Sequence, residues 1–490
     1  MIPLDLAAVA RATDGRVVGV PEGAPVVVDG PVVTDARLAG PGSLYVARQG
    51  VHADGHAFVT DAVARGAVAA LTTRPVDGVP CVVVDPQLEA VGGGVVLQAA
   101  DTALARLARA VLDRLPGVVV TAVTGSVGKT GTKDLLGQVL ATAGPTVAAE
   151  GSYNGEVGVP LTVLRAGAHT RHLLVEMGAR GTGHIRHLTT VAPPRIGVVL
   201  NVGSAHLGEF GSRAAIAAAK AELVQALRPG GTAVLNADDP VVAAMADLVP
   251  AGVRVLLVGE SPAAEITALD VRLDAAARPS FVLAAGGGRA PVSLQLHGEH
   301  QVATALAAAG AALAAGLELP AVGAALSAAT ARSRWRMEVT ERPDGVTVVN
   351  DAYNANPESM RAALKTLALM SRGGRSVAVL GEMLELGADS TAEHDALGRL
   401  AVRLDVRQLV VVGDGARHVH LGAAHEGSWN GESMWVPDAD AAWDLLAGEL
   451  EPGDVVLLKS SHDAGLRHLG DRLAAVGAAP RHRHGSDGTA

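Results

Sequence analysis

Short hydrophobic runs, each ended by glycine or a polar residue, alternate along most of the chain with segments of helical periodicity. From residue 118, the runs in VVVTAVTG, HLLVEMG, RIGVVLNVG and GTAVLNADD predict buried strands with helices between them. Strands that alternate with helices indicate a doubly wound, mostly parallel sheet. RVLLVG, FVLAAG and VSLQLHG predict further strands, and an alanine-rich helix follows from His300.

Two more α/β units flank this block. The first combines the valine-rich strands of PVVVDGPVVTD with the amphipathic helix of LQAADTALARLARAVLDRL, which Pro116-Gly117 ends. The last contains four strand-like runs, in VTVVNDAY, SVAVLGEM, QLVVVGDG and DVVLLKSS, and is typical of a Rossmann-like unit. We therefore expect an α/β protein with three domains at residues 1–112, 113–330 and 331–480, and a disordered polar tail at 481–490.

Composition narrows the class of protein. The 490 residues are 49% hydrophobic and 18% charged, which disfavours a disordered or fibrous chain. A net charge of -10 disfavours a general nucleic-acid binder. The single cysteine, Cys81, excludes an internal disulfide and a cysteine-rich zinc site.

Membrane insertion is also disfavoured. The start of the chain has no basic stretch followed by an apolar one, as a secretory signal would have. The longest charge-free candidate, Val302 to Leu317, is shorter than the ~20 apolar residues of a membrane span. We expect a packed helix there and a cytoplasmic protein.

The strongest local motif is TGSVGKT at residues 124–130, between an apolar strand and a helix. Its glycines let backbone N–H groups approach phosphate, Lys129 would reach the β/γ-phosphates, and the Thr130 hydroxyl would help hold magnesium. The usual Walker pattern has a further glycine where Val123 stands, and an ordinary strand-to-helix turn fits the same residues. The predicted phosphate contacts are Gly125, Ser126, Val127, Gly128, Lys129 and Thr130.

A series of further blocks resembles the Mur ligases, the ATP-dependent amide-bond-forming enzymes of peptidoglycan synthesis. TGSVGKTGTKD is similar to their ATP-binding loop, and it is followed in the expected order by SYNGEVGVPLTVL, VEMGARGTGHI, NVGSAHLGEFGS, AAAKAEL, LNADDP, GEHQVATALAAA, SRWRMEV, VVNDAYNANPESM, VLGEMLELG and DVVLLKSS. TDARLAGPGSLYVARQGVHADGHAFV resembles the family's nucleotide-sugar block. DAYNANPESM and LGEMLELG resemble the branch that adds D-alanyl-D-alanine.

The resemblance implies a reaction with two small-molecule substrates and ATP. ATP would phosphorylate a carboxylate of a UDP-N-acetylmuramoyl tripeptide, and the amine of D-alanyl-D-alanine would attack the acyl phosphate. Two magnesium ions and Lys129 would balance the anions. We also expect a monomer. Two alternatives stay open: a paralogue with another amine or acid substrate, in specialised metabolism or a modified cell wall, and a nucleotide-binding scaffold without turnover.

The family's metal site would comprise Thr130, Glu176, His206 and Lys220, with Lys220 carbamylated by carbon dioxide. Glu176 ends a predicted strand, where ligands bind in open α/β sheets. From the residues alone, Glu176 also fits a helix N-terminal acid, His206 a core or surface histidine, and Lys220 a solvated helix lysine. Only five of the 40 basic residues are lysine, so each one draws interest: Lys129, Lys133, Lys220, Lys365 and Lys459.

The resemblance also implies ligand contacts in all three predicted domains, although loops rich in Asn, Asp and Pro are ordinary turns as well. Those expected for the nucleotide are Asn154, Arg336 and Asp351. Those expected for the incoming dipeptide are Tyr353, Asn354, Asn356 and Lys459. Those expected for the UDP-sugar are Asp35, Arg37, Ser43 and His56.

The chain departs from the family pattern at several positions. Gly155 replaces the second of two adjacent asparagines, and Thr304 replaces an adenine-contacting asparagine. Ala36 interrupts the early Asp-Ser-Arg, and Ser460-Ser461-His462 replaces Gly-Ser-Arg. The phosphate loop and the acidic and lysine positions are intact. We therefore expect preserved chemistry with an altered adenine pocket and altered substrate ends.

Overall fold

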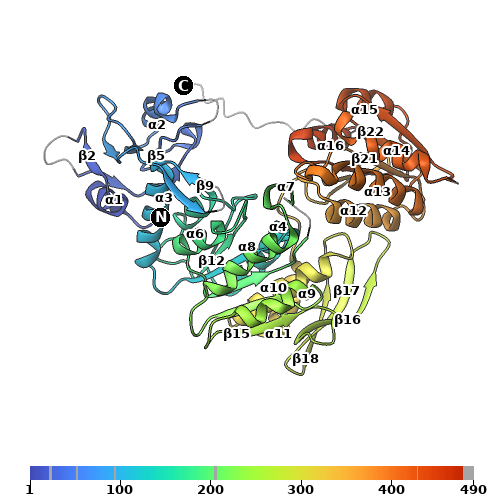
Figure 1. Ribbon diagram of the computed structural model, residues 1–490, viewed down its shortest axis with the longest axis horizontal. Helices are drawn as coiled ribbons and strands as arrows, with labels where there is room; N and C mark the ends of the chain where they lie inside the picture. Colours follow the sequence, from blue (N-terminus) through green and yellow to red (C-terminus); the bar gives the residue numbers. More distant parts are fainter. Residues whose placement is uncertain (21–24, 51–52, 93–94, 204–206, 428, 478–490) are drawn as a thin grey trace.

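The described part of the chain forms three large sheets with covering helices, accompanied by two small strand pairs. The computed structural model describes residues 1–20, 25–50, 53–92, 95–203, 207–427 and 429–477. In Figure 1 the N-terminal unit (blue) lies at the left and the C-terminal unit (orange to red) at the right, with the central unit (green and yellow) between and below them. The predicted α/β class is confirmed, whereas the tail at 481–490 lies outside the described residues.

The N-terminal unit holds a five-stranded sheet of order β2-β7-β6-β5-β4, in which β2 alone runs antiparallel to its neighbour. Its strands are β2 (Arg16–Val18), β4 (Val32–Val33), β5 (Leu44–Val46), β6 (Ala69–Thr72) and β7 (Cys81–Val83). Two small antiparallel pairs accompany it: β1 (Leu4–Asp5) with β3 (Val27–Val28), and β8 (Glu89–Gly92) with β9 (Val95–Leu97). The helices are α1 (Leu6–Thr13), α2 (Val59–Ala64) and α3 (Ala99–Asp113).

The central unit is built on a nine-stranded sheet of order β11-β12-β10-β13-β14-β15-β16-β17-β18. Strands β11 to β15 form its parallel part, and β16 to β18 extend it as an antiparallel ribbon. The parallel strands are β10 (Val119–Thr124), β11 (Thr146–Ala148), β12 (His172–Glu176), β13 (Ile196–Val199), β14 (Thr232–Asn236) and β15 (Arg254–Val258). The ribbon strands are β16 (Ile266–Leu273), β17 (Pro279–Ala285) and β18 (Gly288–Ser293).

The prediction for this ribbon was partly wrong. β16 was missed, because its apolar residues alternate with charged and polar ones instead of forming a run. β18 overlaps only the first two residues of the expected VSLQLHG strand, so most of that segment is a loop.

Helices cover both faces of the central sheet. Helices α4 and α10 pack with the antiparallel ribbon in one hydrophobic cluster, and α5, α6 and α8 pack with α3 in another. The helices are α4 (Lys129–Ala141), α5 (Gly158–Val163), α6 (His184–Val191), α7 (Leu207–Phe210), α8 (Arg213–Gln225), α9 (Pro240–Ala243), α10 (Gln301–Ala314) and α11 (Leu319–Ala328). The expected packed helix is thus α10. Within the described ranges, no helix combines the length and apolarity needed to cross a membrane.

The C-terminal unit holds a six-stranded sheet of order β19-β20-β24-β21-β22-β23, parallel except for β19. Hydrophobic clusters on both faces show that it too is doubly wound. Its strands are β19 (Glu338–Glu341), β20 (Thr347–Asn350), β21 (Ser376–Leu380), β22 (Gln408–Val412), β23 (Glu432–Val436) and β24 (Val455–Lys459). Its helices are α12 (Pro357–Met370), α13 (Ser390–Arg403), α14 (Arg417–His425), α15 (Ala439–Leu446) and α16 (Leu466–Ala474).

The chain passes from the central to the C-terminal unit between α11 and β19, and a side chain of α4 holds the start of this passage. Gln138 Nε2 donates to the Thr330 carbonyl (2.9 Å), and Gln138 Oε1 accepts from the Thr330 N–H (3.1 Å) and from Arg332 Nε (3.2 Å). The expected domain limits at residues 112 and 330 fall at the end of α3 and just after α11, and they stay predictions.

Candidate active site

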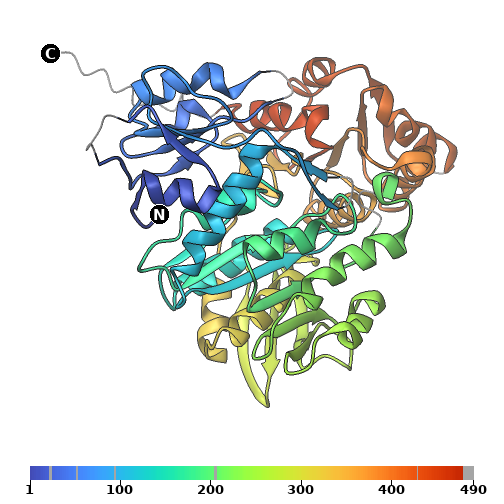
Figure 2. The ribbon, with the colours of Figure 1, turned by 60° about the vertical axis from the view of Figure 1, so that its left-hand side comes forward.

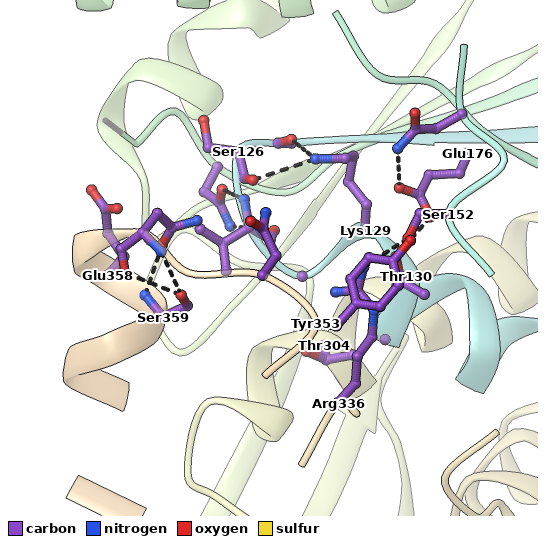
Figure 3. Close-up of a pocket in the computed structure, with 18 of the residues that line it drawn as sticks. Ser126, Lys129, Thr130, Ser152, Glu176, Thr304, Arg336, Tyr353, Glu358 and Ser359 are labelled. Carbon is purple, nitrogen blue, oxygen red and sulfur yellow. Dashed lines mark hydrogen bonds between the residues drawn. The ribbon is translucent and has the colours of Figure 1, made fainter. Parts of the chain in front are cut away.

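A cavity of about 1190 Å³ lies where the carboxyl ends of the central strands face the C-terminal unit. The turned view of Figure 2 shows the C-terminal unit beside the central helices. Figure 3 shows Lys129, Thr130 and Glu176 on one side of the cavity, with Arg336 and Tyr353 close to them. The predicted residues that line it are the phosphate loop from Gly125 to Thr130, Asn154, Glu176, Lys220, Arg336, Asp351, Tyr353, Asn354, Asn356 and Lys459.

The phosphate loop joins β10 to α4. Gly128 has φ 87° and Gly125 has φ 158°, and a Cβ on Gly125 would lie 2.8 Å from the Leu200 side chain. Asn201, which follows β13, fixes the loop: its Oδ1 accepts from the Val127 N–H (2.8 Å) and its Nδ2 donates to the Val127 carbonyl (3.0 Å). Sequence reasoning did not predict this role. The available signal was that asparagine is rare in this chain, so each asparagine was worth examining.

Lys129 begins α4 and folds back over the loop. Its Nζ donates to the carbonyls of Gly125 (2.7 Å) and Ser126 (3.3 Å). Burial lowers the pKa of the Lys129 ammonium, and Arg336 lowers it further, whereas the Glu176 carboxylate raises it. An anionic phosphate beside Lys129 would favour the charged form and oppose the cost of burial.

Glu176 is the last residue of β12 and is buried. Its two oxygens accept from Thr130 Oγ1 and from Asn154 Nδ2, both at 2.9 Å. The nearest following helix, α6, starts only at His184, so the alternative reading of Glu176 as a helix N-terminal acid is wrong. One carboxylate therefore joins the phosphate-loop helix to the SYNGEVG loop.

Lys220 lies on α8 and is only 5% exposed, so the alternative reading as a solvated helix lysine is wrong. Burial, with a smaller contribution from Lys129, lowers its pKa well below that of a free lysine. A buried lysine without its proton is a nucleophilic amine.

The residues fit a magnesium ion that arrives with its nucleotide. Within the described part of the chain, no three His, Cys, Asp or Glu side chains are grouped to hold a metal by themselves. Magnesium is commonly bound through one or two carboxylates plus substrate phosphates, and Glu176 with the Thr130 hydroxyl offers such a partial set. His206 lies outside the described residues, and its part in the site stays a prediction.

The C-terminal unit reaches the phosphate loop through Arg336. Arg336 Nη2 donates to Ser152 Oγ (2.7 Å), and this hydroxyl lies 3.3 Å from Thr130 Oγ1. The guanidinium lies over the Tyr353 ring at 4.2 Å, and Tyr353 meets the His462 ring edge to face at 5.4 Å. Ser152 was not predicted, although it stands two residues before Asn154.

The buried Lys459 forms an ion pair with the partly buried Asp351 at the ends of β24 and β20. Lys459 Nζ donates to Asp351 Oδ2 (2.6 Å) and to the Asn354 carbonyl (2.9 Å). Asp351 Oδ1 accepts from the Met337 N–H (2.9 Å). The pair thus holds the loop that carries Asn354 against the segment that carries Arg336.

Asn356 also has a structural part. It is the N-cap of α12, where its side chain accepts from the Ser359 N–H (2.9 Å). Of the positions that depart from the family pattern, Gly155, Thr304 and His462 line the cavity. The Thr304 hydroxyl is turned back to the His300 carbonyl, although this bond is long at 3.4 Å.

A charged cluster stands on the cavity wall formed by the central unit. His184 lies 3.3 Å and Arg180 3.7 Å from the Glu156 carboxylate. The close approach of His184, with Arg180 nearby, lowers the pKa of Glu156 to about 2, so this carboxylate is ionised. The Arg180 side chain is 65% exposed and is available to an anionic ligand.

The four predicted UDP-sugar residues belong to the N-terminal unit, and the cavity, as the described residues line it, includes none of them. Asp35 and Arg37 pair with each other at 2.7 Å. The buried Ser43 hydroxyl donates to the Gly40 carbonyl (2.7 Å). His56 Nε2 accepts from the Thr73 N–H (3.1 Å), and its Nδ1 contacts Asp54 at 2.6 Å. Their role with a ligand stays a prediction.

A buried histidine fixes the loop after β21, which reaches the cavity at Glu385. His394 Nε2 accepts from the Met383 N–H (3.0 Å), while Nδ1 lies 2.7 Å from the Ser390 carbonyl and donates to it. Both ring nitrogens are therefore used by a neutral imidazole, and burial lowers the pKa of His394.

Comparison with known proteins agrees with this geometry. Residues 123–312 match the Mur ligase middle domain, and residues 335–462 match the Mur ligase, glutamate ligase domain. The UDP-N-acetylmuramoyl-tripeptide–D-alanyl-D-alanine ligase of Mycobacterium tuberculosis (strain ATCC 25618 / H37Rv) is 49% identical, over 97% of this chain and 98% of the relative.

Solved structures give the same result. MurF from Acinetobacter baumannii has a TM-score of 0.83 at 28% identity, covering 96% of this chain and 99% of the other. MurF ligase from Thermotoga maritima, solved in complex with ADP, has a TM-score of 0.75 at 27% identity, covering 92% and 98%. This chain therefore belongs to the Mur ligase family, whose members are ATP-dependent ligases that form amide bonds.

Proposed function

We propose that this chain joins D-alanyl-D-alanine to a UDP-N-acetylmuramoyl tripeptide at the expense of ATP, as a step of peptidoglycan precursor synthesis. The observation that supports the proposal is that a phosphate loop, a buried carboxylate and a buried lysine line one cavity, which Arg336 also lines from the C-terminal unit. The relatives that bear this activity in their names match nearly the whole chain.

The reaction needs an activated carboxylate, because a free carboxylate is a poor acyl donor. Transfer of the γ-phosphoryl group of ATP to a carboxylate of the tripeptide gives an acyl phosphate and ADP. The amine of the dipeptide then attacks the acyl carbon, the C–O bond to phosphate breaks, and phosphate leaves as the amide forms. The amine must lose a proton during the attack.

Residues of this chain have distinct parts in these steps. Lys129 and the loop N–H groups bind and orient the phosphates. Glu176 and Thr130, with His206 and Lys220, would hold magnesium, which when bound neutralises charge on the phosphoryl oxygens. We infer that Lys220 carries a carbamate, since its buried, proton-poor amine is suited to attack carbon dioxide.

The remaining residues would bind substrates. Asn154, Arg336 and Asp351 are proposed for the nucleotide, directly or through a bound ion. Tyr353, Asn354 and Lys459 face the cavity from the C-terminal unit, where we place the dipeptide. Asp35, Arg37, Ser43 and His56 are retained as candidates for the UDP-sugar. A monomeric state and a cytoplasmic location complete the proposal.

The test is product formation by the purified protein with magnesium, ATP, tripeptide and dipeptide. We expect a UDP-linked pentapeptide by mass spectrometry, and ADP release only when both substrates are present. Lys129→Ala should abolish ADP release, whereas Lys365→Ala, on the exposed side of α12, should not. Absence of pentapeptide from the wild-type protein would refute the proposal.

A mixed pool of dipeptides, depsipeptides and amino acids separates this proposal from its main rival. Gly155, Thr304 and His462, which depart from the family pattern, all line the cavity. Because they could contact a substrate, a paralogue with another amine or acid substrate is the rival to test. Preference for D-alanyl-D-alanine over every other amine would exclude that rival.

A further inference from the structure

Two bulky residues on either side of Arg336 have a backbone conformation that L-amino acids rarely adopt. Trp335 has φ 58° and Met337 has φ 51°. Aspartate tolerates this left-handed region, but large side chains without a local polar group do not. In the described chain, the residues with positive φ that are neither glycine nor aspartate are Ala277, Trp335, Met337 and Glu385. Met337 and Glu385 line the cavity, and Trp335 adjoins it.

The surrounding structure holds this turn by several bonds. The Trp335 N–H donates to Glu338 (2.9 Å), the Trp335 carbonyl accepts from the Tyr353 N–H (3.1 Å), and the indole Nε1 donates to Asp471 (3.0 Å). The Met337 N–H donates to Asp351 (2.9 Å). An unfavourable conformation persists only where the neighbours over-determine it, and such positions cluster at functional sites.

The consequence is the direction in which Arg336 extends. Between two left-handed residues, the Arg336 guanidinium stacks on Tyr353 and reaches Ser152 of the central unit. A return of Met337 to negative φ would rotate the peptide that follows Arg336 and would break the Met337–Asp351 bond.

We propose that Met337 and Trp335 are positioning residues, and that their left-handed backbone sets Arg336 in its reach across the cavity before the nucleotide binds. The inference deepens the proposed function, since it rests on Arg336 serving the nucleotide site. Preorganisation of this kind lowers the ordering cost on binding, so its loss should appear in the affinity for ATP.

A purely structural role for Met337 predicts a different result. The Met337 side chain is 8% exposed and belongs to the core cluster of the C-terminal unit. If packing were its whole contribution, Met337→Gly would be the most harmful substitution by every measure, and Met337→Val would be mild. If the backbone conformation of Met337 matters, Met337→Val should weaken ATP binding more than Met337→Gly does. The reason is that glycine adopts positive φ freely and a β-branched residue does not.

The experiment compares the full-length wild-type protein with Met337→Gly, Met337→Asn and Met337→Val. The Kd of a non-hydrolysable ATP analogue with magnesium is measured by calorimetry, and Tm is measured in parallel. We expect Met337→Gly and Met337→Asn to stay within about threefold of the wild-type Kd, although Tm falls. Met337→Val should raise Kd by roughly tenfold or more.

Asp405→Val supplies the matched control. Asp405 has φ 52° in the turn between α13 and β22 and does not line the cavity, so a β-branched residue there should lower Tm without changing Kd. A Kd for Met337→Gly that exceeds the Kd for Met337→Val would overturn the inference. Failure of the wild-type protein to bind the analogue would instead refute the proposed function, so the two failures are distinguishable.

Discussion

Arg336 Nη2 and Ser152 Oγ are joined by a hydrogen bond of 2.7 Å that connects the C-terminal unit to the central unit. The same hydroxyl lies 3.3 Å from Thr130, which donates to the buried Glu176. A continuous polar path therefore runs from the C-terminal unit to the carboxylate at the end of β12. The C-terminal unit is thereby connected to the phosphate loop through Ser152, a residue of the SYNGEVG block that was not among the predicted site residues.

Removal of the Ser152 hydroxyl should weaken this connection. A hydrogen bond to a charged group contributes roughly 1.5–3 kcal/mol, so Ser152→Ala should raise the KM for ATP about tenfold or more. Steady-state kinetics with saturating tripeptide and dipeptide measure the effect. Ser152→Thr keeps the hydroxyl and should stay near the wild-type KM; an equal loss in both variants would show that the hydroxyl is not the relevant group.

Carbamylation of Lys220 can be observed without an activity assay. We expect protein equilibrated with ¹³C-bicarbonate to give a carbamate signal by NMR, and Lys220→Arg to lose it, because arginine offers no nucleophilic amine. Lys220→Arg should also lower kcat by about a hundredfold or more.

Lys365→Arg is the matched control for Lys220→Arg, because Lys365 is exposed on α12. It should keep both the carbamate signal and the activity. A signal that survives in Lys220→Arg would place the modification elsewhere.

Arg180 should serve the anionic tripeptide substrate more than the nucleotide. It lines the cavity beside the ionised Glu156, and its side chain is largely exposed. Arg180→Met should raise the KM for the UDP-tripeptide roughly tenfold and leave the KM for ATP nearly unchanged. Arg165→Met, which removes an exposed arginine outside the cavity, should change neither constant.

His394 should make stability depend on pH below about 6.5. Burial lowers its pKa in the folded state, against the opposing influence of Glu382 and Glu393. Between the lowered pKa and about 6.5, the unfolded chain binds a proton that the folded chain does not, so the free energy of unfolding falls as the pH falls.

The measurement is the free energy of unfolding of wild-type protein and His394→Gln at pH 7.5 and 5.5. The wild-type protein should lose part of its advantage over the variant at the lower pH. His169→Gln, which changes an exposed histidine, should leave the pH dependence as it is in the wild type. A gap between wild type and His394→Gln that is independent of pH would contradict the assignment of a neutral His394.

The sequence predicted the parallel strands and the phosphate loop because buried runs and a glycine turn are local patterns. It missed β16, whose alternating residues cover one half-exposed face, and it misplaced β18. For the site, the motifs named Lys220 but left its burial undecided, since its alanine-rich helix has small apolar residues on every side and shows no clear exposed face. Ser152 and Asn201 act through contacts between distant segments, and no spacing along the chain encodes these.

The side-chain amide of Gln138 hydrogen-bonds to both the backbone N–H and the backbone carbonyl of Thr330. A neighbouring β-strand would satisfy the same two groups in the same way. Gln138 belongs to the helix whose first turn holds Lys129. The start of the passage into the C-terminal unit and the phosphate loop are therefore attached to opposite ends of one helix, α4. The length of that helix sets the spacing between these two attachments.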